Sequence, residues 1–280
     1  MTVTDTFRLD YYHPRSSLPV RLDDPPYYYL GDQGFGLAPL HRITTRGPLQ
    51  QGDSDIDFRL DPRVLQLPII YAISPSTIQR YEHYSARQTL LNLFRPYEQG
   101  LLRVTTTLSS GASITREIAT KVLGGLSFDV DPSSYNIRTV VQLRADDPTW
   151  YDPAGVNITY PQANIGGTQV LSNAGNWFSF PVIRVTGPIT NPVITNNTTS
   201  QAITITATIG AGAYYDINLL YGQKTVFDNL GVNRISTVSA ASALATWTLQ
   251  PGNNTIAITG TGTTAATNIN FDYRVRYTGI

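Results

Sequence analysis

The chain has 280 residues, a formal net charge of zero at pH 7 and only 14% charged residues, well below the ~25% typical of soluble globular proteins. A chain without net charge has no overall basic field to gather nucleic acid, and the lack of cysteine excludes disulfides and thiolate metal sites. No secretion signal stands at the start and no run reaches the ~20 apolar residues of a membrane span, so we expect no membrane insertion.

The first segment, residues 1–62, is rich in turn-forming residues. The Asp-Asp-Pro-Pro run at 23–26 cannot lie inside a helix, because proline restricts its own backbone and that of the residue before it. An uninterrupted loop of this length is uncommon in a compact domain. We therefore expect short strands near residues 27–30, 40–46 and 55–60.

The next two segments predict a strand and then the one clear helix. Residues 63–73 (RVLQLPIIYAI) favour a strand with an edge or a bulge at Pro68. In residues 85–95, Ser85 stands three residues before Gln88, which is the spacing of a capping box. The helix is too short to be stable alone, so its apolar stripe must pack on a sheet; this stripe consists of Ala86, Leu90 and Phe94, widened by Leu91 and Leu93.

Strands are predicted again after the helix. Residues 101–107, 113–120 and 122–130 are rich in β-branched side chains and are separated by Gly or Ser turns. Residues 137–145 alternate strictly, with Ile137, Thr139, Val141 and Leu143 facing one way. This pattern predicts an α+β first domain in which a single helix covers an antiparallel sheet.

The composition changes after residues 143–153 (LRADDPTWYDP), where Thr, Asn and Gly become frequent. Proline and glycine gather in residues 148–167, which we interpret as a hinge. Residues 201–209 (QAITITATI) then alternate, and the last strand places Ile269, Phe271, Tyr273, Val275 and Tyr277 on one face. Many short strands separated by turns predict a sandwich or jelly roll; the others are expected at 214–221, 245–249 and 255–259.

The sequence offers no sign of catalysis. His13, His41 and His83 are not spaced as a metal-binding pair, and the chain lacks the nucleophile elbow, the phosphate loop and the dinucleotide fingerprint. Glycoside hydrolysis usually needs two carboxylates, yet the last glutamate of the chain is Glu117 and residues 153–280 hold three aspartates only. We expect no enzyme activity and no cofactor.

An acidic cluster at Asp53, Asp55, Asp57 and Asp61 has the spacing with which a calcium loop of the EF-hand type begins. It lacks the glycine and the glutamate that complete such a loop. We favour an ion-paired rim over a metal site, with the partners expected at Arg46, Arg59 and Arg63.

The tryptophans admit two interpretations, sugar stacking or packing. Trp247 alternates with Ala245 and Leu249, which is a core pattern, whereas Trp177 lies beside polar residues and leaves both interpretations open. A carbohydrate-binding adhesin is the alternative function for the chain, acting through Trp177, Asn173, Asn233 and Arg234. Trp150 and Tyr151, in the expected hinge, are interpreted as an anchor between the two domains.

Several segments in order resemble the distal tail protein family of siphophages and the wider group of phage tail components. The two most specific are the Asp-Pro-x-Trp-Tyr step at 147–151 and the Asn-x-Gly…Pro-x-Ile entry to the second domain at 173–187. The others are Arg59-x-x-x-Arg63, ARQTLLNLF at 86–94, ITREIATKVLGGLSFDV at 114–130, GQKTVF at 222–227 and LQPGNNTIAI at 249–258.

This resemblance implies a mainly β fold with two domains. Residues 1–152 would be an α+β antiparallel-sheet domain with one helix that closes into a hexameric ring, and residues 153–280 a galectin-like β-sandwich (jelly roll), also likened to carbohydrate modules. The second domain lacks the His and Glu of a galectin sugar site, so sugar binding does not follow from the fold.

The resemblance also implies a place and partners for the chain. The ring would sit in the virion at the tail tip, after assembly in the host cytoplasm, and join the tail tube protein to the tail-tip hub. It would carry adhesion proteins, with a receptor-binding protein or a host glycan as a further partner. Neither nucleic-acid recognition nor membrane insertion is expected.

Overall fold

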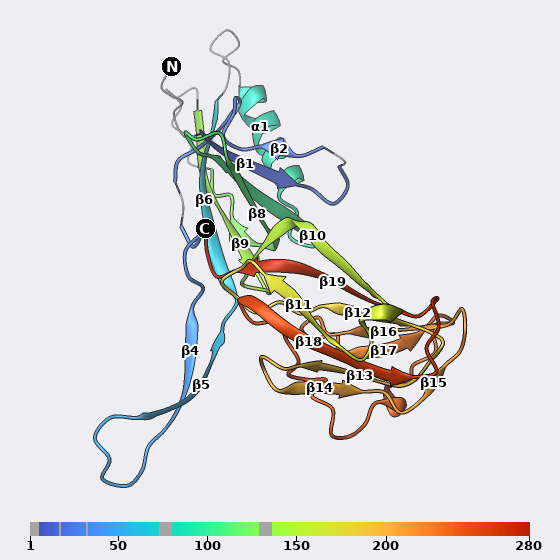
Figure 1. Cartoon of the computed structure of the whole chain (residues 1–280). Coiled ribbons are helices and arrows are strands. Elements are labelled where there is room, and N and C mark those ends of the chain that lie inside the picture. The colour runs from blue at the N-terminus through green and yellow to red at the C-terminus, as the bar shows by residue number, and fades with distance from the viewer. Residues whose placement is uncertain (1–5, 17, 32, 73–79, 129–135) are drawn as a thin grey trace. The chain divides into compact units, whose positions relative to one another are not determined.

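The computed structural model describes residues 6–16, 18–31, 33–72, 80–128 and 136–280. The chain divides into two compact units. Unit 1 holds residues 1–151 together with 278–280, and unit 2 holds residues 152–277. The mainly β fold predicted from the sequence is confirmed in both (Figure 1).

Unit 1 is built on an antiparallel sheet with the order β3-β6-β9-β8-β7-β1-β2. Two further strands, β4 and β5, pair only with each other among the described residues. The elements are β1 (Thr6–Tyr12), β2 (Val20–Arg21), β3 (Tyr27–Tyr29), β4 (Leu40–Thr45), β5 (Ser54–Leu60), β6 (Arg63–Ala72), α1 (Arg80–Leu93), β7 (Gln99–Thr107), β8 (Ser113–Gly125) and β9 (Asn136–Ala145).

The helix α1 packs on this sheet as the sequence pattern predicts. Ala86, Leu90 and Phe94 are buried; Ala86 meets Ile137 of β9, and the Phe94 ring lies 4.8 Å from the ring of Tyr11. The predicted start was wrong, since α1 begins at Arg80 and Ser85 lies inside it, where its carbonyl accepts a hydrogen bond from the Thr89 hydroxyl. Leu91 is exposed and does not widen the stripe.

Unit 2 is a sandwich of two antiparallel sheets, ordered β17-β16-β12-β19-β10 and β11-β18-β13-β14, with β15 paired to β13. Its core lies between the sheets and includes Trp247, Leu249 and Phe271. The strands are β10 (Trp150–Pro161), β11 (Thr168–Asn173), β12 (Val182–Thr186), β13 (Ile189–Asn196), β14 (Gln201–Thr204), β15 (Thr208–Ile209), β16 (Tyr214–Asn218), β17 (Thr225–Asp228), β18 (Gly252–Thr261) and β19 (Asn268–Tyr277), with short 3-10 turns at Gln162–Asn164 and Ile235–Thr237.

Three strand predictions need correction. The expected hinge at 148–167 contains the boundary between the units, after Tyr151, but most of it is the long strand β10, which includes Pro153 and Gly155. Residues 113–125 form one strand rather than two, with a bulge that absorbs the irregular register between Val122 and Gly124. Residues 245–249 are not a strand, although Trp247 is buried as expected.

The alternating segment at 201–209 has the predicted faces but is broken into β14 and β15. Ile203, Ile205 and Ile209 are buried. The break lies opposite an irregular stretch of β13, where Asn191 has a positive φ of 47° and the pairing register with β18 shifts before Val193.

Within the described residues, no helix has the length and apolar character needed to cross a membrane.

Candidate functional site

The most exposed structured part of unit 1 is the hairpin of β4 and β5, which we call the arm. It is a two-stranded ribbon separate from the larger sheet of the unit (Figure 1). Every residue of β4 is exposed, and in β5 only Leu60 is partly covered. An isolated two-stranded hairpin is marginally stable in water, so the arm lacks the support that other strands of the unit receive.

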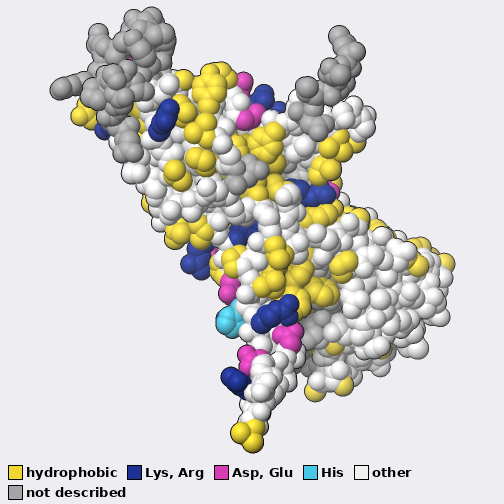
Figure 2. Space-filling model, turned by 90° about the vertical axis from the view of Figure 1, so that its left-hand side faces the viewer, with side chains coloured by type: hydrophobic (Ala, Val, Ile, Leu, Met, Phe, Trp, Pro, Cys, Tyr) yellow, Lys and Arg dark blue, Asp and Glu magenta, His cyan; other side chains and the backbone are white. Residues whose placement is uncertain are grey.

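The arm carries apolar side chains although it has no core of its own. Ile43 is 42% exposed and Ile56 is 62% exposed, while Leu49 in the connecting loop is fully exposed. Figure 2 shows hydrophobic side chains at the tip of the arm and charged side chains along it. Exposed apolar groups on an unsupported ribbon are typical of a surface that another chain covers.

The acidic cluster lies on or beside this arm and is partly ion-paired. Arg42 Nη1 is 2.8 Å from Asp55 Oδ2, and Arg59 Nε is 3.5 Å from Asp61 Oδ1. Of the expected partners only Arg59 takes this role: Arg46 donates to the Gln50 carbonyl instead, and Arg63 is buried elsewhere. Among the described residues no three His, Asp or Glu side chains gather as metal ligands.

Arg63 is the most buried charged side chain in the described part of unit 1, and sequence reasoning missed its role. Its Nη1 donates to the carbonyl oxygens of Gly34 and Gly36 at 3.0 and 2.9 Å, and its Nη2 donates to that of Thr278 at 2.6 Å. Burial lowers the pKa of Arg63 to about 10, so the guanidinium stays charged at neutral pH. The arginine thus fixes residues 278–280 in unit 1.

Trp150 and Tyr151, the predicted anchor, both lie in unit 1. Trp150 is fully buried, with its ring 5.3 Å from that of Phe35 and 5.8 Å from the Arg63 guanidinium carbon. The Tyr151 hydroxyl donates to the carboxylate of Asp147, which also accepts the Thr149 hydroxyl. The Asp-Pro-x-Trp-Tyr step therefore leads from a bend at residues 146–147 into β10 and is held by contacts within unit 1; its role as an anchor between domains stays a prediction.

Asn173 and Trp177, two of the four predicted sugar contacts, lie together in unit 2. The Asn173 side chain is fully buried, and its Nδ2 donates to the carbonyls of Trp177 and Leu249 at 2.8 and 3.2 Å, while its Oδ1 accepts the Gly175 N–H. Trp177 is half-buried, with its ring against that of Phe178. The Asn173 side chain stabilises the turn at residues 173–177. Of these two residues, only Trp177 has a solvent-accessible side chain that a sugar could contact.

Asn233 and Arg234, the other two, lie beside β17, where the chain turns back: Asn233 pairs with Phe227, and the Arg234 N–H donates to the Val226 carbonyl. Arg234 Nε donates to Asp228 Oδ2 at 2.8 Å, and backbone N–H donors led by that of Val232 keep the pKa of the Asp228 carboxyl below its usual value. Asn233 is exposed and its Oδ1 accepts the Ile235 N–H. Sugar contact by the four residues therefore stays a prediction.

Comparison with known proteins gives one family match and several similar folds. Residues 174–277 match the model of the family described as "Siphovirus-type tail component, C-terminal domain". The fold is similar to the Dit (gp 19.1) protein of phage SPP1, with a TM-score of 0.66 at 12% identity, over 95% of this chain and 98% of that chain. That structure is described as a paradigm of the hub adsorption apparatus in phages that infect Gram-positive hosts.

Two further structures align less closely. Chains of the phage P2 baseplate in its activated conformation, with Ca and with Sr, have TM-scores of 0.49 and 0.48 at 8% identity, each over 96% of this chain and 98% of that chain. No curated protein matches in sequence. The resemblance to siphophage tail components stated above is confirmed, by sequence for the sandwich and by fold for both units.

Proposed function

We propose, from the siphovirus-type tail-component domain at residues 174–277, that this chain is a structural protein of a phage tail tip and not an enzyme. Copies of unit 1 associate head to tail and close into a hexameric ring in the virion. The ring joins the tail tube protein to the tail-tip hub, and unit 2 supports adhesion proteins on it. The likeness in fold to SPP1 Dit supports this assignment.

The arm is the observation that carries the ring proposal. Its strands are exposed, bear apolar side chains and find no further strand partner within the described residues. A head-to-tail interface places a different surface of each copy against its neighbour, and such contacts form a ring when the rotation closes. The arm of one copy docks on the neighbouring copy, which supplies the cover that its own chain does not.

The electrostatics of the chain agree with close packing of copies. A net charge of zero imposes no long-range repulsion between identical subunits. Nearly all cations are arginines, since Lys121 and Lys224 are the only lysines. Arginine forms planar contacts with several donors and is enriched at interfaces, whereas lysine is depleted there.

The test is the mass of the native assembly, measured by light scattering and native mass spectrometry. The wild-type chain should form hexamers. The double variant Ile43→Glu/Ile56→Glu should remain folded yet become monomeric, because it puts two charges where the arm meets its neighbour.

A matched control makes the same chemical change on unit 2. Val170 and Val232 are 60% and 46% exposed, close to the two isoleucines of the arm, and Val170→Glu/Val232→Glu should leave the hexamer intact. A wild-type chain that stays monomeric at high concentration would overturn the ring. Equal loss of assembly in both double variants would overturn the role of the arm.

A further inference from the structure

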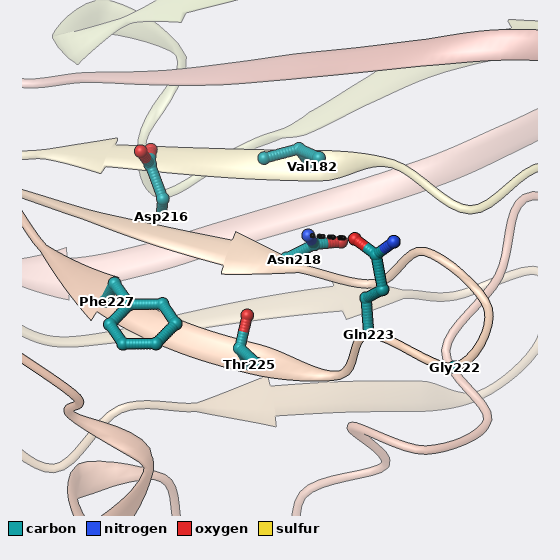
Figure 3. A pocket seen from close by; sticks show the side chains of 7 residues that line it. All are labelled: Val182, Asp216, Asn218, Gly222, Gln223, Thr225 and Phe227. Atoms are coloured by element: carbon teal, nitrogen blue, oxygen red, sulfur yellow. Dashed lines mark hydrogen bonds between the residues drawn. The ribbon is translucent and has the colours of Figure 1, made fainter. Parts of the chain in front are cut away.

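A groove lies on the outer face of the β17-β16-β12 part of unit 2 (Figure 3). Strand pairing builds it: Asn218 of β16 is in register with Val182 of β12 and Thr225 of β17. Its volume is about 600 Å³, within the 300–1,000 Å³ range of small-molecule sites. The side chains that line it include Val182, Asp216, Asn218, Gln223, Thr225 and Phe227.

The one carboxylate in the groove is neutralised in place. Arg184 Nε and Nη2 donate to Asp216 Oδ1 and Oδ2 at 2.7 and 2.8 Å, a bidentate pair. The guanidinium carbon of Arg184 lies 4.1 Å from the ring centroid of Tyr214, which fixes its plane. Each Asp216 oxygen keeps a lone pair for a further donor. The site therefore accepts hydrogen bonds without attracting a charged ligand.

Neutral polar groups continue along the groove from this pair. Asn218 Nδ2 and Gln223 Oε1 are 3.4 Å apart, joined by the dashed line in Figure 3. The Asn218 oxygen is already used by the Leu220 N–H at 2.9 Å. Gln223 is exposed and keeps its amide donors, and the Thr225 hydroxyl can donate or accept. A ligand with several hydroxyl groups, each both donor and acceptor, matches this array.

An aromatic ring adds an apolar surface at one end. Phe227 is 39% exposed, and Figure 3 shows its ring at the end of the groove opposite Gln223. Phe227 of β17 is in register with Asp216 of the adjacent strand β16, so the ring and the carboxylate lie side by side. A flat apolar face beside fixed polar groups is the general character of a small-molecule site, and it suits a ligand with both C–H and hydroxyl surfaces.

We propose that this groove binds a neutral oligosaccharide. A pyranose ring presents its C–H face to Phe227, and its hydroxyl groups reach Asp216, Gln223 and Thr225. Trp177, Asn233 and Arg234 do not line the groove, although Asn233 pairs with Phe227 at its edge. Sugar binding here is independent of ring closure by unit 1. A strongly anionic ligand is disfavoured because Arg184 is already satisfied by Asp216.

The experiment uses the full chain and three neutral disaccharides, namely lactose, maltose and N,N′-diacetylchitobiose, with a sulfated heparin disaccharide as the charged comparison. Binding is measured by isothermal titration calorimetry and by ligand-observed NMR. At least one neutral disaccharide should bind, and more tightly than the heparin disaccharide. Phe227→Ala, Gln223→Ala and Thr225→Val should each lower that affinity about tenfold, as the loss of one contact of ~1.4 kcal/mol does.

Two controls test whether the loss of affinity comes from the groove, and not from the surface around Trp177 or from loss of folding. Trp177→Ala should leave the affinity unchanged, and the melting temperatures of the groove variants should stay close to wild type, since Phe227 and Gln223 are exposed. Thr225→Val keeps the shape of the side chain and a strand-favouring residue, so its effect reports the hydroxyl group alone.

Four results would overturn the inference. They are no binding of any neutral disaccharide, tighter binding of the sulfated one, loss of binding in Trp177→Ala with the groove variants unaffected, and loss of another tail protein's binding in Phe227→Ala without any sugar binding. The last would make the groove a protein-docking site.

Discussion

At the residue scale, Arg63 illustrates how much a single side chain can organise. It holds three carbonyl groups of residues 34–36 and one of Thr278, and it lies against the Trp150 ring. A buried charge is tolerated only when it is paired and hydrogen-bonded. Here carbonyl dipoles and an aromatic face replace a carboxylate partner, with Asp147 adding a favourable charge nearby.

We therefore expect Arg63→Met to destabilise unit 1 by about 3 kcal/mol or more, because it leaves several buried carbonyl groups without donors. Arg63→Lys should recover only part of this, since a single ammonium cannot span the four acceptors. The measurement is urea unfolding followed by tryptophan fluorescence in a background where Trp177 and Trp247 are replaced by Phe, so that the signal comes from the buried Trp150. The control is Arg59→Met, an exposed site, and an equal loss in both variants would contradict this account.

Lys224 of unit 2 is a half-buried cation and gives a pH-dependent prediction. Its Nζ donates to the Leu219 carbonyl at 2.6 Å and lies 5.0 Å from the centroid of the Phe180 ring. Burial lowers the pKa of Lys224 from 10.5 to about 8. Between these two values the unfolded chain binds more protons than the folded one at this position, so the contribution of Lys224 to stability rises with pH.

The stability of the wild type relative to Lys224→Met should accordingly increase from pH 8 to about 10.5 and stay flat below pH 8. Melting temperatures across this range provide the measurement. Lys121→Met, which removes the other lysine of the chain, is measured alongside. The same pH slope for both variants would show that burial of Lys224 is not the cause.

The residues that sequence reasoning placed well are those with local patterns. Alternation identified the buried faces of β9 and β19, and the core position of Trp247. It failed for Arg63, expected on an acidic rim, because its acceptors come from residues 34–36 and 278, which no local pattern connects to it. The groove on unit 2 was missed for the same reason, since its polar residues meet only through strand pairing.

At the element scale, the apolar stripe correctly predicted the helix, but the predicted first residue was wrong. Ser85 and Gln88 have the spacing of a cap, yet α1 continues through residues 80–84. These five residues are Arg-Tyr-Glu-His-Tyr: Arg80 and Glu82 favour a helix, but the two tyrosines and His83 do not, and no apolar stripe runs through them. Packing of Ala86 and Leu90 on the sheet stabilises the helix. The helix then extends toward its N-terminus through the residues before Ala86.

Leu90→Asp should unfold unit 1 or destabilise it by several kcal/mol, because a lone carboxylate would replace a fully buried side chain in the packing of α1 on the sheet. Leu91→Asp is the matched control on the next residue, which is exposed, and it should cost little. Circular dichroism and thermal melting compare the two. Similar melting temperatures for both variants would mean that α1 does not pack as described.

The broken strand at 201–209 shows the limit of periodicity at this scale. The alternation correctly predicts which side chains are buried, but it cannot register an irregularity in the facing strand β13. Likewise, prolines and glycines in 148–167 suggested a hinge, yet residues 150–161 of this segment form β10. Pairing with a neighbouring strand overrides weak local preferences.

At the scale of the whole molecule, the sequence predicted a mainly β chain with one helix and a sandwich, and these features are present. It did not predict that β4 and β5 leave the larger sheet as an arm. That separation depends on which strands find partners, and the arm has none beyond its own two strands within the described residues. In the proposed ring, the exposed apolar side chains of the arm would be covered by a neighbouring copy.

The return of residues 278–280 to unit 1 has a consequence for how the chain acquires its structure. The sandwich is an insert within the first unit, joined to it at Tyr151 and again at Thr278. Bringing the ends of so long an unstructured insert together costs about 4 kcal/mol of entropy. A sandwich that folds early holds β10 and β19 as neighbours and removes this cost. A foreign module grafted in its place would need two closely spaced termini to preserve the host unit.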